Sequence, residues 1–461
     1  MTKYKLNKNI FREYDIRGIV EEDFPEAFVY DLGLAIGTKF LELGEKSIGV
    51  SGDLRKTTKF IKKKLLEGLV DTGMDVIDLG ILPTPANYYS MYKLEEINSA
   101  IQITGSHNSI DYNGFKISYN KTPFYGKNIQ ELRRIINNRS FNIVQDSSIK
   151  GDIKSFDISS DYMSLLHSKI NINRKILIVM DCLNFCGALI APEEFSSLNN
   201  VWLKTINANP NGDCISESPD PTLDKNLSQL VSENNSNEYD FGIAYDGDAD
   251  RLVVVDDKGQ IIRSDILLAL FSYYIVSDGD KVVYDVKCSK AVEDIVRVKK
   301  GIPVICKTGH SYIKDKMNET NAILGGEMSG HMFFSDDYFG YDDAIYASLR
   351  LAELISKTDK KLSQLISKIP KYYSSPEIRI KCNNDEEKFE ITNKLIDYFK
   401  KEYECDCTDG VKVKFKHGWG LVRASNTQPV LVCRYESNST EGLKNIESTI
   451  MDKVNSYLCK I

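Results

Sequence analysis

Three segments of the sequence share one pattern: a basic or polar lead, a run of apolar residues, and then polar residues. They are residues 46–53, 175–181 and 281–287. An apolar run bounded by polar residues is typical of a buried strand, and strands that alternate with helical patterns indicate parallel sheets with crossover helices. The first such helix is predicted near residues 57–72, where apolar side chains are spaced among lysines. The pattern predicts three α/β domains of similar build.

The pattern changes after about residue 375. A strand-like segment at 377–381 precedes an amphipathic helix that runs to about residue 401, and three alternating segments then lead to a last helix over about 441–457. This order predicts a small α+β domain at the C-terminus. The predicted domains are residues 1–152, 153–255, 256–367 and 368–461.

Composition excludes several classes of protein. The 461 residues include 66 acidic and 59 basic side chains, mixed along the chain, so neither nucleic acid nor a membrane surface is indicated as a partner. The longest apolar run, residues 266–276, is too short to cross a bilayer and predicts a buried helix. The N-terminus lacks the apolar core of a signal peptide, and the ten cysteines lack the paired spacing of a zinc site. We expect a cytoplasmic protein with reduced thiols.

The segment 104–109 reads Thr-Gly-Ser-His-Asn-Ser and follows an apolar run. Ser106 beside His107, at the carboxyl end of a predicted parallel strand, would present a hydroxyl for phosphoryl or acyl transfer. A polar turn without function is the alternative at this stage. The nucleophile elbow of hydrolases needs glycine two residues before and two after the serine, where Thr104 and Asn108 stand, so an acyl-serine hydrolase is disfavoured.

Three aspartates alternate between two apolar runs, at Asp246, Asp248 and Asp250. Carboxylates at alternate positions of one turn can converge on a hard divalent cation such as Mg²⁺ or Ca²⁺. An EF-hand is excluded, because Arg251 stands where its glycine is needed and the flanks are strand-like. A solvated turn remains the alternative. Beside a cation, Arg251 could neutralise a phosphoryl group in transfer.

Five other polar segments hold candidate groups, although each could also be an ordinary surface turn. Arg17 ends a charged N-terminal segment and could hold a phosphate through its guanidinium. Lys287 and His310 each follow an apolar run and could serve as general acid, general base or hydrogen-bond donor. Residues 325–331, Gly-Gly-Glu-Met-Ser-Gly-His, offer partners for sugar hydroxyls. Residues 423–428, Arg-Ala-Ser-Asn-Thr-Gln, could cup a phosphate.

With these motifs assembled in order, the chain resembles the α-D-phosphohexomutase superfamily, and within it the bacterial phosphomannomutase/phosphoglucomutase group. The matching segments are the Tyr-Asp-Ile-Arg-Gly lead-in at 14–18, the serine loop, the aspartate loop at 246–251, and residues 326–331 and 423–429. The resemblance covers essentially the whole chain. It implies four domains around a central cleft, three of them α/β with mixed sheets and the fourth an α+β domain of the TATA-binding-protein-like type.

The resemblance also implies roles for individual residues. Ser106 would carry the phosphoryl group, and with Asp246, Asp248 and Asp250 it would hold Mg²⁺. The residues implied to surround the transferring phosphoryl group are Arg17, His107, Lys116, Arg251 and Lys287. The residues implied to bind the sugar or its distal phosphate are Tyr14, His310, Glu327, Ser329, His331, Arg423, Ser425, Asn426 and Thr427.

The implied reaction interconverts the 1-phosphate and the 6-phosphate of mannose or glucose through a phosphoserine enzyme and a hexose 1,6-bisphosphate, with glucose 1,6-bisphosphate as activator. Phosphoglucosamine mutase is the alternative within the superfamily, and Met328 resembles the mannose/glucose group. A non-catalytic sugar-phosphate-binding protein would not need Ser106 or the aspartates, and a magnesium-dependent phosphatase would not need a second phosphate cup. We expect hexose phosphates as partners and a monomer or weak homo-oligomer.

The serine loop departs from the usual family pattern, Thr-Ala-Ser-His-Asn-Pro, at two positions. Gly105 replaces the alanine and Ser109 replaces the proline. Because proline would fix φ, we expect a less constrained turn, in which Ser106, His107 and Asn108 are intact and activity survives.

Overall fold

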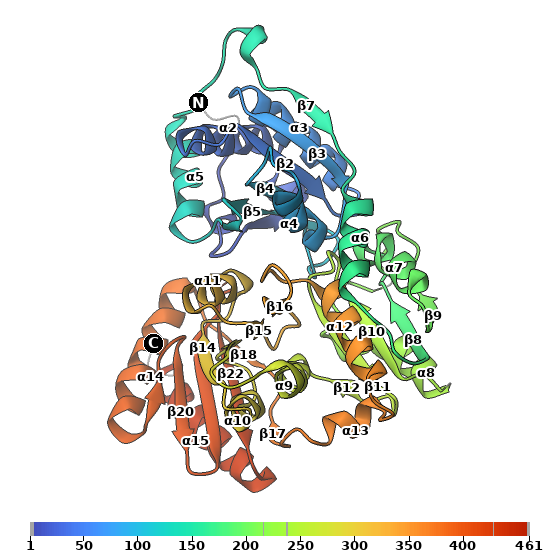
Figure 1. The fold of residues 1–461 in the computed structure, drawn as a ribbon. Helices are drawn as coiled ribbons and strands as arrows, with labels where there is room; N and C mark the ends of the chain where they lie inside the picture. The colour runs from blue at the N-terminus through green and yellow to red at the C-terminus, as the bar shows by residue number, and fades with distance from the viewer. Residues whose placement is uncertain (1–3, 215, 237, 427, 459–461) are drawn as a thin grey trace. The chain divides into compact units, whose positions relative to one another are not determined.

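The computed structural model describes residues 4–458 apart from residues 215, 237 and 427 (Figure 1). The chain forms two compact units, one of residues 1–263 and 329–364 and the other of residues 264–328 and 365–461. None of the described helices is both long enough and apolar enough to cross a bilayer.

The first unit begins with a mixed seven-stranded sheet in the order β1-β5-β4-β2-β3-β7, with β6 beside β5. Strands β4, β2, β3 and β7 are parallel neighbours, and β1, β5 and β6 pair antiparallel. The strands are β1 (Ile16–Ile19), β2 (Ser47–Gly52), β3 (Asp75–Ile81), β4 (Ala100–Ile103), β5 (Tyr112–Tyr119), β6 (Thr122–Pro123) and β7 (Ile153–Ser155). The helices are α1 (Val20–Asp23), α2 (Glu26–Glu42), α3 (Thr58–Val70), α4 (Thr84–Lys93) and α5 (Lys127–Asn138), with short 3₁₀ turns η1 (Lys8–Ile10) and η2 (Ser147–Ile149).

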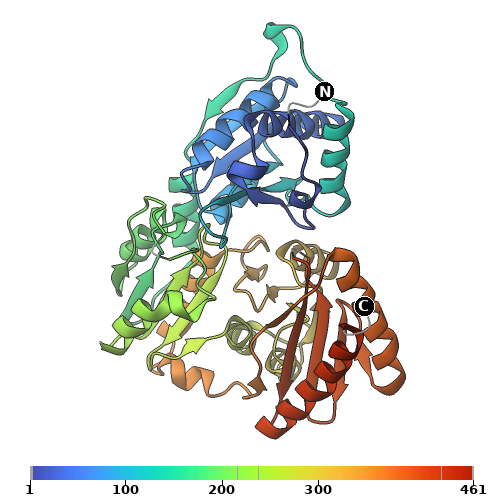
Figure 2. The same cartoon turned by 180° about the vertical axis from the view of Figure 1, so that it is seen from behind.

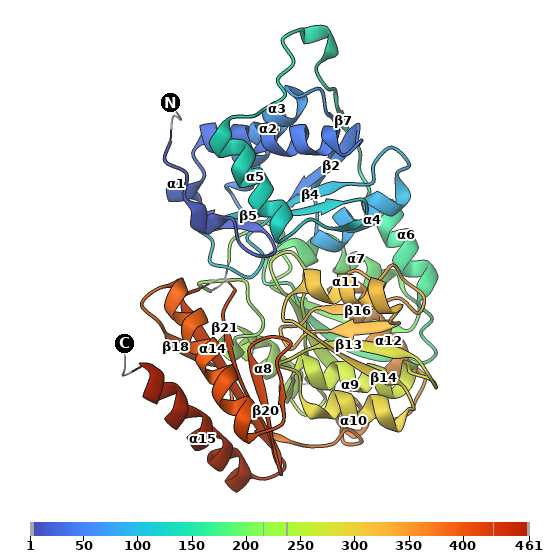
Figure 3. The same cartoon turned by 90° about the vertical axis from the view of Figure 1, so that its left-hand side faces the viewer.

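Helices cover both faces of this sheet (Figure 3). Ile48 and Val50 on β2 belong to the core cluster built with α2 and α3. A Cβ on Gly49, between them, would instead meet the side chains of Ile97 and Leu79, with Ser90 of α4 next to them. Since alternate residues of a strand face opposite sides, β2 is buried on both faces, which explains why it carries no charged residue.

A second mixed sheet completes the first unit, in the order β12-β11-β10-β8-β9. Figure 2 shows its green strands from behind. Strand β8 is parallel to β9 and β10, whereas β10 and β11 form an antiparallel hairpin whose turn carries residues 246–251. The strands are β8 (Ile176–Asp181), β9 (Val201–Ile206), β10 (Phe241–Tyr245), β11 (Leu252–Asp256) and β12 (Ile261–Ile262). The helices are α6 (Ser159–Lys169), α7 (Ala191–Ser197) and α8 (Ser228–Ser236), with turns η3 (Cys186–Leu189) and η4 (Asp224–Leu227). The chain returns to this unit for β16 (Met332–Phe334) and α12 (Ala344–Ser356), and α13 (Leu362–Ile366) leads out of it.

The second unit begins with three parallel strands in the order β14-β13-β15. They are β13 (Lys281–Asp285), β14 (Ile302–Cys306) and β15 (Leu324–Gly326), and the accompanying helices are α9 (Ser264–Ile275), α10 (Lys290–Val298) and α11 (His310–Thr320). The predicted buried helix is α9, whose leucines are inaccessible to solvent. Ser289 caps α10 by accepting a hydrogen bond from the backbone N–H of Ala291, which ends the loop after β13 at a defined point.

The C-terminal part of the second unit is the predicted α+β domain. Its six strands form one antiparallel sheet in the order β17-β22-β21-β20-β19, with β18 also beside β22. The strands are β17 (Tyr373–Ser374), β18 (Ile378–Lys381), β19 (Cys405–Asp406), β20 (Val411–Phe415), β21 (Gly418–Ala424) and β22 (Val430–Ser437). Helices α14 (Asp385–Glu402) and α15 (Thr440–Leu458) pack on it through one apolar cluster. The predicted fold class is confirmed; the short strands β17 and β19 were not predicted.

Candidate active site

The serine turn follows β4 at the carboxyl edge of the parallel strands, as predicted. Ser106 is 2% exposed and has a φ of +49°, in the left-handed region that residues other than glycine rarely adopt. Its Oγ donates a hydrogen bond of 2.9 Å to Oδ2 of Asp246 and lies 3.2 Å from Nδ1 of His107. The serine hydroxyl therefore faces a carboxylate that lies 140 residues further along the chain.

The turn between β10 and β11 buries all three predicted aspartates. Asp246, Asp248 and Asp250 are each 0% exposed, and one oxygen of each lies within 4.8 Å of the others. Oδ1 of Asp246 accepts hydrogen bonds from the backbone N–H groups of Asp250 and Arg251. Oδ1 of Asp248 and Oδ1 of Asp250 have no hydrogen-bond donor among the described residues. Buried carboxylate oxygens without donors are costly unless a cation binds them, so this donor set fits a divalent metal ion.

Lys116 on β5 bridges two of these carboxylates. Its Nζ donates to Oδ2 of Asp248 at 2.6 Å and also contacts Oδ2 of Asp250. Burial would lower the pKa of Lys116, but the two carboxylates raise it above its usual range. Burial would raise the pKa of Asp248, but the ammonium and the Thr84 hydroxyl lower it. Burial, and then the charges of its two neighbours, raise the pKa of Asp246 well above its usual range. This is the pattern that crowded carboxylates with one bridging ammonium produce.

Arg17 and His107 lie at the same turn. Arg17 on β1 is 7% exposed, pairs with Asp15 at 2.5 Å and donates through Nη1 to Oδ1 of Asn108 at 2.7 Å. Burial, and then the nearby charges of Arg251 and Arg17, lower the pKa of His107 well below its usual range. His107 is therefore a neutral imidazole beside the serine hydroxyl at neutral pH.

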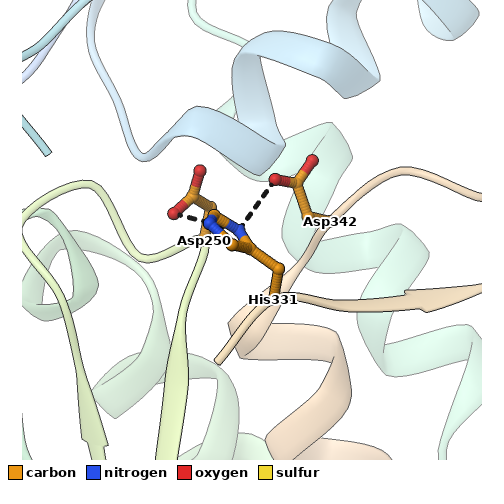
Figure 4. A group of neighbouring side chains, drawn as sticks. All are labelled: Asp250, His331 and Asp342. Atoms are coloured by element: carbon orange, nitrogen blue, oxygen red, sulfur yellow. Dashed lines mark ion pairs between the residues drawn. The ribbon is translucent and has the colours of Figure 1, made fainter. Parts of the chain in front are cut away.

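A second group of side chains adjoins the aspartate turn (Figure 4). Nε of Arg251 donates a hydrogen bond of 3.1 Å to Nε2 of His331. Nδ1 of His331 lies 3.0 Å from Oδ2 of Asp342 and 3.6 Å from Oδ1 of Asp250. Because Nε2 accepts, the ring proton is assigned to Nδ1, toward the carboxylates. Asp342, which is fully buried, was missed because a pair of adjacent aspartates carries no recognisable motif.

In the second unit, three predicted residues follow the carboxyl ends of its parallel strands. Lys287 follows β13 and has its Nζ 3.3 Å from Oε2 of Glu377. His310 is the first residue of α11, after β14. Glu327 follows β15 and accepts a hydrogen bond from the backbone N–H of Gly309. Parallel pairing puts these strand ends at one edge of the sheet.

The predicted phosphate loop lies between β21 and β22. Nε of Arg423 donates to Oδ2 of Asp409 at 2.8 Å. The backbone N–H of Ser425 donates to the carbonyl of Val430 at 2.9 Å, which closes the hairpin. Asn426 is half-buried. Thr427, also predicted for this loop, lies outside the described residues.

Two further predicted residues belong to the first unit. Tyr14 is half-buried between η1 and β1, and Ser329 is half-buried in the turn before β16. The segment predicted to bind the sugar is therefore divided, since Ser329 and His331 belong to the unit of the aspartate turn and Glu327 to the other unit.

A buried arginine, Arg55, lies against the serine turn at both positions where it departs from the family pattern. A Cβ at Gly105 would lie 2.4 Å from Cζ of Arg55, and the guanidinium of Arg55 donates a hydrogen bond to the carbonyl of Ser109 itself. The two departures from the family pattern therefore lie against a buried guanidinium, and the less constrained turn stays an expectation. A signal was present, since Asp53-x-Arg55 directly follows a predicted strand that ends at the same edge of the sheet.

The fold and the site define a phosphotransferase, and comparison with known proteins specifies which kind. Four family models match in succession: phosphoglucomutase/phosphomannomutase alpha/beta/alpha domain I over residues 8–143, domain II over 160–259, domain III over 263–373, and the C-terminal domain over 377–453. The chain therefore belongs to the phosphoglucomutase/phosphomannomutase family.

Individual relatives agree. The phosphomannomutase/phosphoglucomutase of Pseudomonas aeruginosa is 38% identical over 452 residues, covering 97% of this chain and 96% of that protein. The phosphoglucomutase of Neisseria meningitidis is 34% identical, with 96% of each chain covered. A crystal structure of a phosphoglucomutase/phosphomannomutase family protein from Burkholderia thailandensis superposes with a TM-score of 0.90 at 32% identity, covering 98% of each chain. The predicted superfamily, the mutase class and the four-domain architecture are confirmed.

Proposed function

We propose that this protein interconverts the 1-phosphate and 6-phosphate of mannose or glucose, with Ser106 as the phosphoryl carrier. The observation that carries this assignment is the contact between Ser106 Oγ and Asp246 Oδ2 at 2.9 Å, at the edge of a buried aspartate cluster. A serine hydroxyl has no use for such a cluster in sugar binding alone. It has one if the serine is phosphorylated and a cation neutralises the phosphate.

The metal would be held by one oxygen each from Asp246, Asp248 and Asp250, together with an oxygen on Ser106. These are hard oxygen donors of the kind that Mg²⁺ prefers. When bound, Mg²⁺ supplies positive charge to the phosphoryl oxygens during transfer.

The chain's own side chains have separate tasks in this proposal. Phosphorylated Ser106 donates its phosphoryl group to a free hydroxyl of the hexose monophosphate: the bond from Oγ to phosphorus breaks, a bond from the sugar oxygen to phosphorus forms, and the sugar proton ends on Oγ. The product is a hexose 1,6-bisphosphate. Its other phosphoryl group then returns to Ser106 by the reverse exchange. Lys116, Arg17 and Arg251 stabilise the charge of the moving group.

Sugar and distal phosphate are assigned to the remaining residues. Glu327, Ser329 and His331 offer acceptors and donors for hydroxyl groups, with Tyr14 and His310 as further contacts, whereas His107 and Lys287 stay among the groups proposed to surround the moving phosphoryl group. Arg423, Ser425, Asn426 and Thr427 are proposed to hold the phosphate that is not transferred. Because this loop must accept a phosphate on either C1 or C6, it should recognise phosphate and little else.

Several finer expectations stay within this proposal. We propose Mg²⁺ as the metal, glucose 1,6-bisphosphate as activator, a cytoplasmic location, and a monomer or weak homo-oligomer. Analytical ultracentrifugation over a range of concentrations tests the last point, and chelation followed by readdition of Mg²⁺, Mn²⁺ or Ca²⁺ tests the first.

A coupled assay tests the reaction itself. Glucose 1-phosphate, mannose 1-phosphate and glucosamine 1-phosphate are compared, each with and without a catalytic amount of glucose 1,6-bisphosphate. We expect turnover of the first two, stimulation by the bisphosphate, and a mass increase of one phosphate on wild-type protein that is absent from Ser106→Ala. Equal rates for wild type and Ser106→Ala would disprove the phosphoserine mechanism, and turnover of the glucosamine substrate alone would move the assignment to phosphoglucosamine mutase.

A further inference from the structure

We propose that Arg55 is a positioning residue for phosphoryl transfer, whose guanidinium fixes the backbone of the Ser106 turn and so aims Ser106 Oγ at the aspartate cluster. This role rests on the mutase function proposed above and deepens it. In the interactions described, Arg55 contacts neither the Ser106 hydroxyl nor the carboxylates of Asp246, Asp248 and Asp250, so its influence must pass through the main chain of the turn.

The guanidinium of Arg55 is buried and fully used. The residue is 4% exposed, and an arginine side chain carries five N–H groups in a planar fork. Nε donates to Oδ2 of Asp53 at 3.1 Å. The other acceptors are the carbonyls of Ser106 (2.7 Å) and Asn108 (2.6 Å) for Nη2, and those of Ser109 and Tyr112 (2.9 Å) for Nη1. One side chain thus satisfies four carbonyls of a single turn.

Asp53 completes the frame around the turn. Its carboxylate is 0% exposed and accepts from the hydroxyl of Thr104 at 2.7 Å and from the backbone N–H of Gly105 at 3.2 Å, as well as from Arg55. The pair Asp53–Arg55 therefore contacts the turn from its first residue onward. A buried ion pair that satisfies all its hydrogen bonds holds one geometry.

The conformation of Ser106 explains why such a frame is needed. Its φ of +49° is a strained value for a residue with a Cβ. Hydrogen bonds on both sides of the Ser106 α-carbon maintain this conformation. The carbonyl of Ser106 accepts from Arg55 Nη2, and the N–H of Ser106 donates to Oγ1 of Thr104 at 2.8 Å. Since φ and ψ of Ser106 set the direction of its Cα–Cβ bond, Arg55 helps to set the direction of the nucleophile.

Lysine could not replace this arginine. An ammonium has three donors and no planar fork, so it would leave buried carbonyls unsatisfied. Gly105 belongs to the same device, because a Cβ there would lie 2.4 Å from Cζ of Arg55. The methyl group of Gly105→Ala should push the guanidinium away from its acceptors without removing a charge.

The test is the first chemical step, followed by rapid quench and intact mass. Dephosphorylated full-length protein with Mg²⁺ is mixed with glucose 1,6-bisphosphate; the phosphorus–oxygen bond to the sugar breaks, the bond to Ser106 Oγ forms, and the serine proton ends on the released sugar oxygen, which becomes a hydroxyl. Wild type should gain one phosphate to full amplitude. Arg55→Lys should reach the same amplitude about 10²-fold more slowly, the effect of misplacing a reacting group by about 1 Å.

Rate and amplitude separate positioning from folding. A purely structural role would lower the fraction of competent protein, so the amplitude would fall while the rate stayed at the wild-type value. That result, or a rate within twofold of wild type at full amplitude, would overturn the role of Arg55. Absence of phosphate on wild-type Ser106 would instead overturn the mutase proposal, and this role with it.

Three further variants complete the design. Gly105→Ala keeps every donor and should also slow the step at full amplitude, which covers the case in which Arg55→Lys does not fold. Arg55→Ala should be activated by millimolar guanidinium chloride in a saturable way, and not by the same concentration of sodium chloride. Arg174→Lys is the matched control, because this arginine also donates to main-chain carbonyls, those of Thr358 and Lys175, and should leave the rate unchanged.

Discussion

In two loops of this protein a buried, positively charged side chain donates hydrogen bonds to main-chain carbonyls. That side chain is an arginine in one loop and a lysine in the other. The Ser106 turn rests on Arg55, whose fork reaches four carbonyls. The loop after β21 rests on Lys388 of α14, which is 3% exposed and donates through Nζ to the carbonyls of Ser425 at 2.7 Å and Gln428 at 2.9 Å. A guanidinium imposes one orientation on its acceptors, whereas an ammonium on a flexible stem tolerates rotation.

This difference suits the tasks proposed for the two loops. Ser106 must present its oxygen in line with a phosphorus atom twice in each catalytic cycle, so a fixed backbone is an advantage. The loop of Arg423 must hold a phosphate on either C1 or C6 of the sugar, so some adjustment is an advantage there. We infer that rigidity is concentrated where the bond is made and relaxed where the substrate is only held.

The largest expected effect is at Lys116, whose ammonium holds two carboxylates of the aspartate cluster beside the Ser106 turn. Lys116→Met removes the ammonium that bridges Asp248 and Asp250, so the transferring phosphoryl group loses a fixed positive charge. We expect kcat to fall by about 10³-fold, with KM changed little. The three carboxylates would still bind a divalent cation, and at least as tightly, because a competing charge has gone.

Steady-state kinetics and calorimetric titration with Mg²⁺ measure the two effects. Lys62→Met is the control, since Lys62 of α3 is a partly buried lysine that pairs with a single carboxylate, that of Asp78 on β3, at 2.5 Å. A kcat for Lys116→Met within threefold of wild type would show that the buried ammonium only balances charge in the fold.

The second loop should respond differently to loss of its lysine. Lys388→Met leaves the carbonyls of Ser425 and Gln428 without their shared donor, so the loop loses its preferred shape but keeps Arg423. We expect KM for the hexose phosphate to rise about fivefold, equivalent to about 1 kcal/mol of ground-state binding, and kcat to stay within twofold. Lys394→Met on the same helix, whose lysine pairs with exposed Glu390, should change neither. A fall in kcat without a change in KM would remove the distinction between the two loops.

Some parts of the site and the fold could be predicted from the sequence because a few consecutive residues reveal them. The aspartate cluster and the serine turn were found because their chemistry is local: alternating carboxylates between two strands, and Ser-His after a strand, are visible in a few consecutive residues. Strands β2, β8 and β13 were predicted for the same reason, since burial on both faces leaves an unbroken apolar run.

The main-chain contacts of Arg55 and Lys388 and the contact of Asp342 with His331 could not be predicted in this way, although Asp53-x-Arg55 marks Arg55 as lying at the end of a predicted strand. Their partners are main-chain carbonyls or a histidine ring, and any residue type can supply a carbonyl, so no pattern of side chains records the contact. Strand pairing and helix packing alone bring Lys388 to residues 37 and 40 positions away in the sequence. Proximity and chemistry support the roles proposed for the site residues, and substitutions of those residues test them.

The smallest expected effect is at Asp343, which follows Asp342, the aspartate that contacts His331. This residue caps α12, accepts hydrogen bonds from the hydroxyls of Tyr162 at 2.8 Å and Tyr338 at 2.7 Å, and is 1% exposed. Burial raises its pKa to about 6. The native state therefore keeps this proton at pH values where the unfolded chain, with a pKa of about 3.9, has released it. The free energy of unfolding accordingly falls as pH rises through about 6.

Asp343→Asn removes this dependence while keeping a capping side chain. Between pH 5 and pH 7 the wild type should lose about 1 kcal/mol from this group alone, so the stability of the variant relative to wild type should rise by that amount. Urea unfolding of both proteins at pH 5, 6 and 7, followed by tyrosine fluorescence, measures the difference. Asp337→Asn, at an exposed aspartate that pairs with Lys169, should give a difference that does not vary with pH. If the stability difference between Asp343→Asn and wild type were also independent of pH, the Asp343 carboxylate would be ionised from pH 5 to pH 7. Tyr162 and Tyr338 would then donate their hydrogen bonds to a charged carboxylate next to Asp342, which contacts His331.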